Sequence, residues 1–291
     1  MSTRTLISPA ALARPRGRVL YWTVLALVAV VFTLAFLGPL YWLVTNGLKT
    51  TQEAVQTPPT LVPHTLQPEN YSRAWEVMDL ARLLFNTLYY AFGALAFQLV
   101  LDVAAAYSLS KLRPVFGKAI LGMMLATLMI PATVLVVPQY LTVLDVPIFQ
   151  RNLLNSPWAI WLPSVTNAFN IFLLKRFFDS IPRELLDAAS VDGASPMRTL
   201  WSVVLPISRP VLGVVSIFAV VGVWKDFLWP MLTLPDPNKQ TLNVGIYSLS
   251  MGVPENVLIA ALAMACVPTL LIFLLFQRNI MGGLTAGSLK G

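Results

Sequence analysis

Apolar residues dominate the chain in long runs, and polar residues fall mainly between these runs. A helix needs about 20 apolar residues to cross the roughly 30 Å hydrocarbon core of a bilayer. Six windows approach or exceed this length: residues 20–44, 84–109, 118–137, 158–174, 211–232 and 257–276. In lipid, backbone polar groups must be paired within the segment itself, so runs this continuous predict helices and not barrel strands.

A polar, amphipathic stretch separates the fourth window from the fifth. Pro182 suits the first position of a helix, and Glu184 and Asp187 place carboxylates near its partly positive N-terminal end. Gly193 can end that helix because glycine readily adopts a positive φ. The sequence therefore predicts a first short helix over residues 182–192.

A second short helix is expected directly after this turn. Ser195 is a good N-cap and Pro196 a good first residue, and the helix should run through Trp201 toward Leu205 and Pro206. Two short helices joined by a tight turn form a small polar projection. Local chemistry leaves open whether it docks a soluble partner or is a solvated loop.

The face of the first helix also has a pattern. Glu184, Asp187 and Val191 follow one another at helical spacing, and the small Ala188 and Ala189 would let a partner surface approach closely. This pattern favours the docking interpretation without deciding it.

Composition places the chain in the membrane. With 57% apolar residues, 11% charged residues and a mean hydropathy of +0.71, it cannot form a water-soluble globule with a polar surface. The net charge of +7 is explained by anionic lipid headgroups beside the windows, so we expect no nucleic-acid partner. A lone cysteine, Cys266, excludes an intramolecular disulfide.

Basic residues are distributed unevenly between the two sides. Most of the 20 Lys and Arg residues lie in the N-terminal tail, the turn after the second window, the polar stretch at 175–209 and the C-terminal tail. The opposite loops hold Lys49, Arg73, Arg82, Arg151 and Lys239. By the positive-inside rule, both termini and the polar stretch should be cytoplasmic. The first window is too long for a cleavable signal and is expected to be an uncleaved signal-anchor.

We therefore expect an all-α, polytopic membrane protein with six transmembrane helices, a cytoplasmic helix-turn-helix and both termini cytoplasmic. Its parts would be an N-tail at 1–19, one transmembrane domain at 20–277 that includes the polar stretch, and a C-tail at 278–291. The first outer segment, 45–82, has turn residues followed by an amphipathic run around 74–77, expected to lie across the membrane surface. Pro131, Pro138, Pro163 and Pro268 should break or bend spans, either lining a cavity or as ordinary bends.

The polar stretch resembles the EAA loop of ABC-importer permeases. The matching residues are Asp187-Ala188-Ala189, Gly193, Val203 and Leu205-Pro206, at the family's spacing. Further matches to the carbohydrate-uptake branch, similar to the maltose-type permease subunit, are Pro68-Glu-Asn-Tyr71, Ala105-Ala-Tyr107-Ser-Leu-Ser-Lys111, Trp224-Lys-Asp-Phe-Leu-Trp-Pro230 and the tail from Gly283 to Gly291. Two positions depart from the family: Asp187 stands for the usual Glu, and Lys225 for a common Asn.

This resemblance implies a permease subunit, and not an enzyme, in the bacterial cytoplasmic (inner) membrane. It would form half of the pore of an ATP-driven importer, with a second permease subunit and an ATP-binding cassette ATPase dimer. An extracytoplasmic binding protein would deliver the sugar, a mono- or oligosaccharide. No cofactor would be bound by this chain, since ATP and Mg are used by the ATPase. The implied coupling residues are Glu184, Asp187, Ala188, Ala189, Asp192, Gly193, Leu205 and Pro206.

The sequence agrees with the expectation that a separate subunit hydrolyses ATP. The chain has no Gly-x-x-x-x-Gly-Lys-Ser/Thr phosphate loop, and its one histidine, His64, has no catalytic partner pattern. The alternative is an ion-coupled secondary carrier acting alone, which would need paired intramembrane acids, whereas Asp102 and Asp226 are isolated.

Candidate substrate-path residues are polar or aromatic and near the middle of the spans: Asn167, Asn170, Trp224, Lys225, Asp226 and Phe227. Lys225 has two interpretations, a functional intramembrane cation or a side chain that extends outward to the interface. Asp102 could relay protons, but we expect it to pack against the partner subunit or to face cavity water. The sequence does not identify the sugar.

Overall fold

Helices make up nearly all of the chain in the computed structural model, which describes residues 14–147 and 149–286. Within those residues there is no strand, only an isolated bridge between Val146 and Arg151. The helices fall into two units, one of residues 1–74 with 253–263 and the other of 75–252 with 264–291. The N-terminal arginine Arg4 and the last residues of the C-tail lie outside the described part.

The first unit contains α2 (Pro15–Gly47), α3 (Thr51–Ala54), most of α4 (Glu69–Val77) and the start of α16 (Glu255–Ala286). Asn70 ties this unit together, because its side-chain amide donates to the carbonyls of Gly47 and Lys49, each at 2.9 Å. Gly47 is required there: a Cβ would lie 3.0 Å from the backbone of Ala260 on α16. The expected amphipathic run around 74–77 is confirmed as the end of α4.

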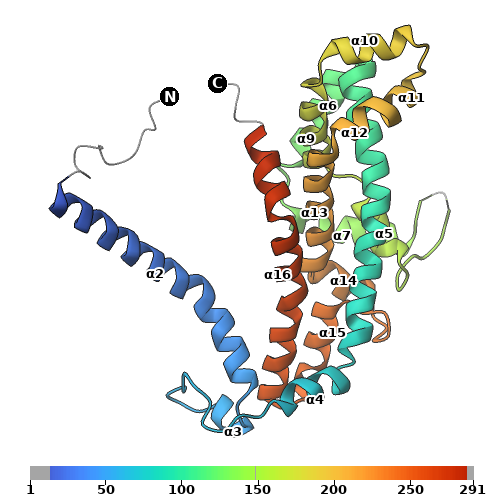
Figure 1. The fold of residues 1–291 in the computed structure, drawn as a ribbon. Coiled ribbons are helices and arrows are strands. Elements are labelled where there is room, and N and C mark those ends of the chain that lie inside the picture. The colour runs from blue at the N-terminus through green and yellow to red at the C-terminus, as the bar shows by residue number, and fades with distance from the viewer. Residues whose placement is uncertain (1–13, 148, 287–291) are drawn as a thin grey trace. The chain divides into compact units, whose positions relative to one another are not determined.

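The second unit is built around α5 (Leu80–Tyr107), extended by the π-helical turn η1 (Ser108–Leu112) (Figure 1). It packs along α13 (Arg209–Lys225) and α9 (Ala168–Asp179). Small residues on α5, Ala91, Ala94 and Ala106, are fully buried and let these helices approach closely. The remaining helices of this unit are α6 (Gly117–Thr127), α7 (Ala132–Leu144), α8 (Trp158–Trp161), η2 (Leu162–Ser164), α10 (Arg183–Val191), α11 (Pro196–Thr199), η3 (Leu200–Val204), α12 (Leu205–Ile207), α14 (Leu228–Thr233), α15 (Leu242–Leu249) and η4 (Ser250–Gly252).

Among the described residues, three helical stretches are long and apolar enough to span a membrane: Pro15–Gly47, Leu80–Leu112 and Glu255–Leu275. Two bent pairs raise the number to five if each is one span: α6 with α7, bent by 103°, and the Pro196–Ile207 segment with α13, bent by 83°. The prediction of a continuous helix over 158–174 is wrong, because the chain leaves helical geometry between η2 and α9.

Prolines and polar residues explain these interruptions. Pro131 precedes α7 with extended ψ and ends the run of 118–137, as expected, while Pro163 lies in the short η2 turn. The window 211–232 is also divided, because Asp226 and Phe227 separate α13 from α14. Pro138 and Pro268, in contrast, lie inside α7 and α16, which continue through them.

Candidate functional site: an acidic helical surface and a polar cavity

The segment between α9 and α13 forms a surface at one end of the second unit, here called the α10–α11 surface. Helix α10 starts after Pro182, which occupies the N-cap position and not the first helical position expected. Glu184 lies in its first turn, where a carboxylate interacts favourably with the helix dipole. The predicted helix of 182–192 is therefore confirmed to within one residue at each end.

Gly193 sets the turn between the two short helices. Its φ is +73°, its amide donates to Ser190, and the amide of Ala194 donates back to Ala189 at 2.9 Å. This pair of bonds is a Schellman ending, which needs a residue that tolerates a left-handed backbone. Ser195 then caps α11 by accepting from the amide of Arg198, so the predicted second helix start is also confirmed.

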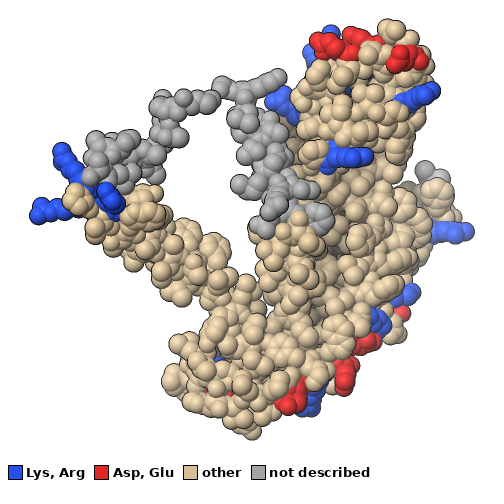
Figure 2. Space-filling view, in the orientation of Figure 1, with Lys and Arg blue, Asp and Glu red and all other residues tan. Residues whose placement is uncertain are grey.

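Acidic side chains point outward from this surface. Figure 2 shows Asp and Glu atoms gathered where Figure 1 places α10, and Glu184, Asp187 and Asp192 are all exposed. Apolar side chains accompany them: Val191 is 88% exposed and Trp201 66%. Exposed carboxylates beside exposed apolar groups are suited to binding another macromolecule, because a solvated loop gains nothing by presenting the apolar ones.

The rest of the predicted coupling set is only partly accessible. Ala188 and Pro206 are exposed, whereas Ala189 and Leu205 are partly buried. Leu205 packs against a buried cluster shared by α5, α9 and α13, and so does Leu186 from the inner face of α10. The hydroxyl of Tyr107 on α5 also donates to the carbonyl of Pro196 at 2.9 Å. The α10–α11 surface is thus packed onto the helices that support it.

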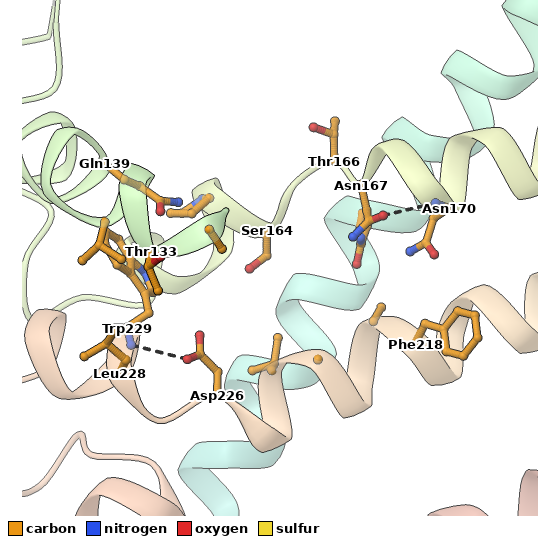
Figure 3. Close-up of a pocket in the computed structure, with 17 residues that line it drawn as sticks. Thr133, Gln139, Ser164, Thr166, Asn167, Asn170, Phe218, Asp226, Leu228 and Trp229 are labelled. Atoms are coloured by element: carbon orange, nitrogen blue, oxygen red, sulfur yellow. Dashed lines mark hydrogen bonds between the residues drawn. The ribbon is translucent and has the colours of Figure 1, made fainter. Parts of the chain in front are cut away.

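A polar cavity of about 500 Å³ lies within the same unit. Its polar lining comes from α5, α7, the stretch from η2 into α9, and the end of α13 (Figure 3): Gln98, Thr133, Gln139, Ser164, Thr166, Asn167, Asn170 and Asp226. Phe218, Leu228 and Trp229 add apolar and aromatic faces. Amides, hydroxyls and aromatic rings together suit a ligand that carries both hydroxyl groups and apolar ring faces.

Two helix breaks bring backbone and side chains into this cavity. At the first, Asn167 caps α9, with its side-chain oxygen accepting from the amides of Phe169 and Asn170. At the second, a carboxylate oxygen of Asp226 lies 3.4 Å from the amide of Trp229 (Figure 3). Irregular backbone at membrane depth is tolerated where it lines a cavity, which accounts for both breaks.

Asp102 binds the cavity residue Asn167 but does not itself line the cavity. It is fully buried, and one of its carboxylate oxygens accepts from the backbone amide of Asn167 at 3.0 Å. The expectation that Asp102 packs against a partner subunit or faces cavity water is therefore wrong, because α5 and the start of α9 enclose it. That oxygen lies at the N-terminal end of α9 and accepts from one of the backbone amides there.

Three of the six predicted substrate-path residues line the cavity: Asn167, Asn170 and Asp226. The other three do not: Trp224 is buried, Lys225 is exposed away from the cavity lining, and Phe227 packs edge-to-face on Tyr247 at 5.2 Å. The lining residues that the sequence prediction missed, including Gln98, Thr133 and Gln139, share one signal. Each is an uncharged polar residue inside an apolar run.

Comparisons with known proteins all match this chain to transport permeases. The model of the binding-protein-dependent transport system inner membrane component matches residues 82–283. The sulfoquinovosyl glycerol transport system permease protein SmoH of Agrobacterium fabrum is 34% identical over 259 residues, 88% of this chain and 89% of that protein. The diacetylchitobiose uptake system permease protein NgcG of Streptomyces coelicolor is 29% identical and covers 90% of this chain and 86% of its own length.

A solved structure shares the fold. A chain from the crystal structure of a bacterial ABC transporter involved in the import of the acidic polysaccharide alginate superimposes with a TM-score of 0.79. The match covers 91% of this chain and 98% of that chain, at 23% sequence identity.

Proposed function

Because the chain belongs to the family of binding-protein-dependent transport system inner membrane components, we propose that it forms half of the pore of an ATP-driven saccharide importer. A second permease subunit completes the pore, a separate ATPase dimer hydrolyses ATP with Mg²⁺, and an extracytoplasmic binding protein delivers the saccharide. Both termini and the α10–α11 surface face the cytoplasm in this arrangement, on the side that carries most of the basic residues.

One observation carries this proposal: the α10–α11 surface and the polar cavity are built on the same helices. Helix α9 runs from the cavity residue Asn167 toward α10, and α13 runs from the end of α12 to the cavity residue Asp226. A displacement of α10 by the ATPase would therefore move both walls of the cavity. A rigid element linked to two sites is what coupling between nucleotide and substrate requires.

The cavity also indicates a class of saccharide. Asp226 is the one charged residue among its lining residues, and no Lys or Arg is among them. An anionic sugar would lose its hydration there without gaining a cation from this chain, and it would be repelled by the carboxylate. The half of the pathway built by this chain therefore favours an uncharged saccharide, held by amides, hydroxyls and the Trp229 ring.

Proteoliposomes test the transport proposal. Vesicles that contain the chain with its co-purifying permease and ATPase subunits should take up saccharide only when binding protein is outside and ATP is inside. Uptake by this chain alone, driven by an ion gradient, would establish the secondary-carrier alternative instead.

Variants of Asp226 test the substrate class. Asp226→Asn keeps an acceptor for the Trp229 amide and should leave uptake of a neutral disaccharide within about threefold of wild type. Asp226→Lys should improve uptake of a sugar phosphate relative to that neutral disaccharide by about tenfold, because reversing one charge is worth roughly 1–2 kcal/mol at a partly buried site. Faster uptake of the sugar phosphate than of the disaccharide by the wild-type complex would contradict the proposed preference.

A further inference from the structure

A second, strongly basic cavity lies near the α10–α11 surface and plays no part in the proposed transport path. It measures about 630 Å³ and is lined by η1, the start of α6, the end of α9 and the residues that lead into α10. Its charged lining residues are Lys111, Arg113, Lys118, Lys175, Arg183 and a single acid, Asp179. The lining thus has a large excess of positive charge.

The single acid does not compensate this excess, because its oxygens are already engaged. One oxygen of Asp179 pairs with Lys175 at 2.7 Å, and the other accepts from the Ser110 hydroxyl at 2.7 Å. Burial by itself would raise the pKa of Asp179, but these two hydrogen bonds and the nearby Lys111 hold that pKa below its ordinary value. Asp179 therefore remains ionised and committed to Lys175.

The other cations have no carboxylate partner among the described residues. Lys111 reaches only the carbonyl of Ile181, at 3.5 Å, and Arg113 reaches the carbonyl of Ser110, at 3.3 Å. Asp179 attracts Lys111 electrostatically, whereas Arg113 and Arg183 repel it. Cations gathered around a cavity without counter-charges repel one another, which an anion bound among them would relieve.

The turn beside the cavity is apolar and exposed. Between η1 and α6 the chain exposes 94% of Val115, 73% of Phe116 and 55% of Leu112. Arg113, with φ near +50°, lies between Leu112 and Val115, so basic and apolar side chains alternate around a tight turn. Alternating cations and large apolar groups are typical of segments that insert at the headgroup level of an anionic bilayer.

We propose that this cavity binds the phosphate of an anionic phospholipid headgroup, with Leu112, Val115 and Phe116 inserted beside it into the bilayer interface. The side of the membrane rests on the proposed function, which makes it the cytoplasmic leaflet. A free phosphate offers the same charge, but it gives the exposed apolar turn nothing to contact. Since Arg183 is the first residue of α10, the bound headgroup would also hold the base of the α10–α11 surface.

Lipid retention by the purified complex tests this site. The complex is incorporated into nanodiscs of equal phosphatidylglycerol and phosphatidylcholine, re-extracted in mild detergent, and its retained lipids are counted by native mass spectrometry. The test variant is Arg113→Gln with Lys118→Gln. The matched control is Arg73→Gln with Arg151→Gln, which removes the same charge from exposed positions outside this cavity.

Wild type and control should retain phosphatidylglycerol over phosphatidylcholine. The test variant should retain it about 25-fold less, since each of the two basic residues removed contributes roughly fivefold near anionic lipid. Equal retention by test and control variants would overturn the proposal. Inorganic phosphate at millimolar concentration distinguishes the sources: complete displacement of the lipid would assign the cations to a soluble anion.

Subunit composition is measured on the same samples. Loss of the ATPase subunit from the test variant with unchanged lipid would assign these cations to a protein contact and overturn the proposal. Because lipid counting involves no transport, its result is independent of whether the saccharide-import proposal holds.

Discussion

The α10–α11 surface and the polar cavity lie in the same unit but are built in opposite ways. The surface is made by one short segment, with its turn at Gly193 and its second cap at Ser195. The cavity takes residues from four separated segments, and Gln98 and Asp226 stand far apart in the chain. Local backbone chemistry therefore fixes the first, whereas helix packing fixes the second.

The largest expected effect follows a change in the local turn. Gly193→Val places a β-branched residue at φ +73°, which costs on the order of 1–2 kcal/mol and favours a different turn. We expect ATP-dependent uptake to fall about 100-fold while membrane insertion stays normal, as measured by transport and membrane fractionation.

A second substitution separates backbone strain from loss of space. No atom lies within 4 Å of a Cβ at Gly193, so Gly193→Asn, which tolerates a positive φ, should keep most uptake. Gly122→Val, at another open glycine in α6, controls for bulk alone. Normal uptake by Gly193→Val would refute the role given to this turn.

A change at Asp102 tests the long-range construction of the cavity. Asp102→Ala removes the acceptor of a partly buried hydrogen bond from the Asn167 amide, which should destabilise the protein by about 1 kcal/mol. The expected readout is a lower unfolding temperature in detergent together with weaker saccharide uptake. Asp145→Ala, at an exposed acid, should change neither, and equal effects of the two would show that the contact is unimportant.

Two glycine-to-alanine substitutions test the packing of α5 against Trp161. A Cβ at Gly93 would lie 2.3 Å from the indole of Trp161, so Gly93→Ala should destabilise the unit by about 1–3 kcal/mol. Gly122→Ala has no neighbour to meet and should be neutral or slightly stabilising. The difference between the unfolding temperatures of the two variants measures the cost of the clash with Trp161. A difference near zero would show that the contact between Gly93 and Trp161 is not tightly packed.

The smallest effect is expected in the first unit, in the loop that follows α3. This loop lies outside both the α10–α11 surface and the polar cavity and so serves as a reference for them. Glu53 is buried, which opposes its charge, but the Thr60 hydroxyl at 2.7 Å and the His64 amide at 3.0 Å donate to it and lower its pKa below 4.5. This contribution to stability is present above pH 4.5 and is lost as the pH falls through the lower folded pKa.

Limited proteolysis of this loop should therefore accelerate as the pH is lowered below 4.5, with an acid-tolerant protease. Glu53→Gln cannot ionise, so its cleavage rate should depend much less on pH. The same pH dependence in both proteins would rule out Glu53 as its source.

The same comparison shows which structural features sequence patterns can predict. Caps and turns depend on side chains within a few residues, so Pro182, Gly193 and Ser195 predicted the two short helices correctly. Asn167, Asn170 and Asp226 line the cavity, and their contact with substrate stays a prediction. Trp224 and Phe227, neighbours of Asp226, are not among the lining residues, which adjacency in the sequence could not reveal.

The sequence by itself determined that the chain is helical and membrane-embedded, since the length of its apolar runs and the cost of unpaired backbone in lipid leave few alternatives. It also determined the two short helices of the α10–α11 surface, because their caps and the turn between them depend on nearby residues. Only the tertiary structure decided that 158–174 is broken, that Asp102 supports α9, and that the cations around Lys111 share one cavity. Each of these depends on which helices pack together, and long-range packing leaves no periodic signal in the residues that make it.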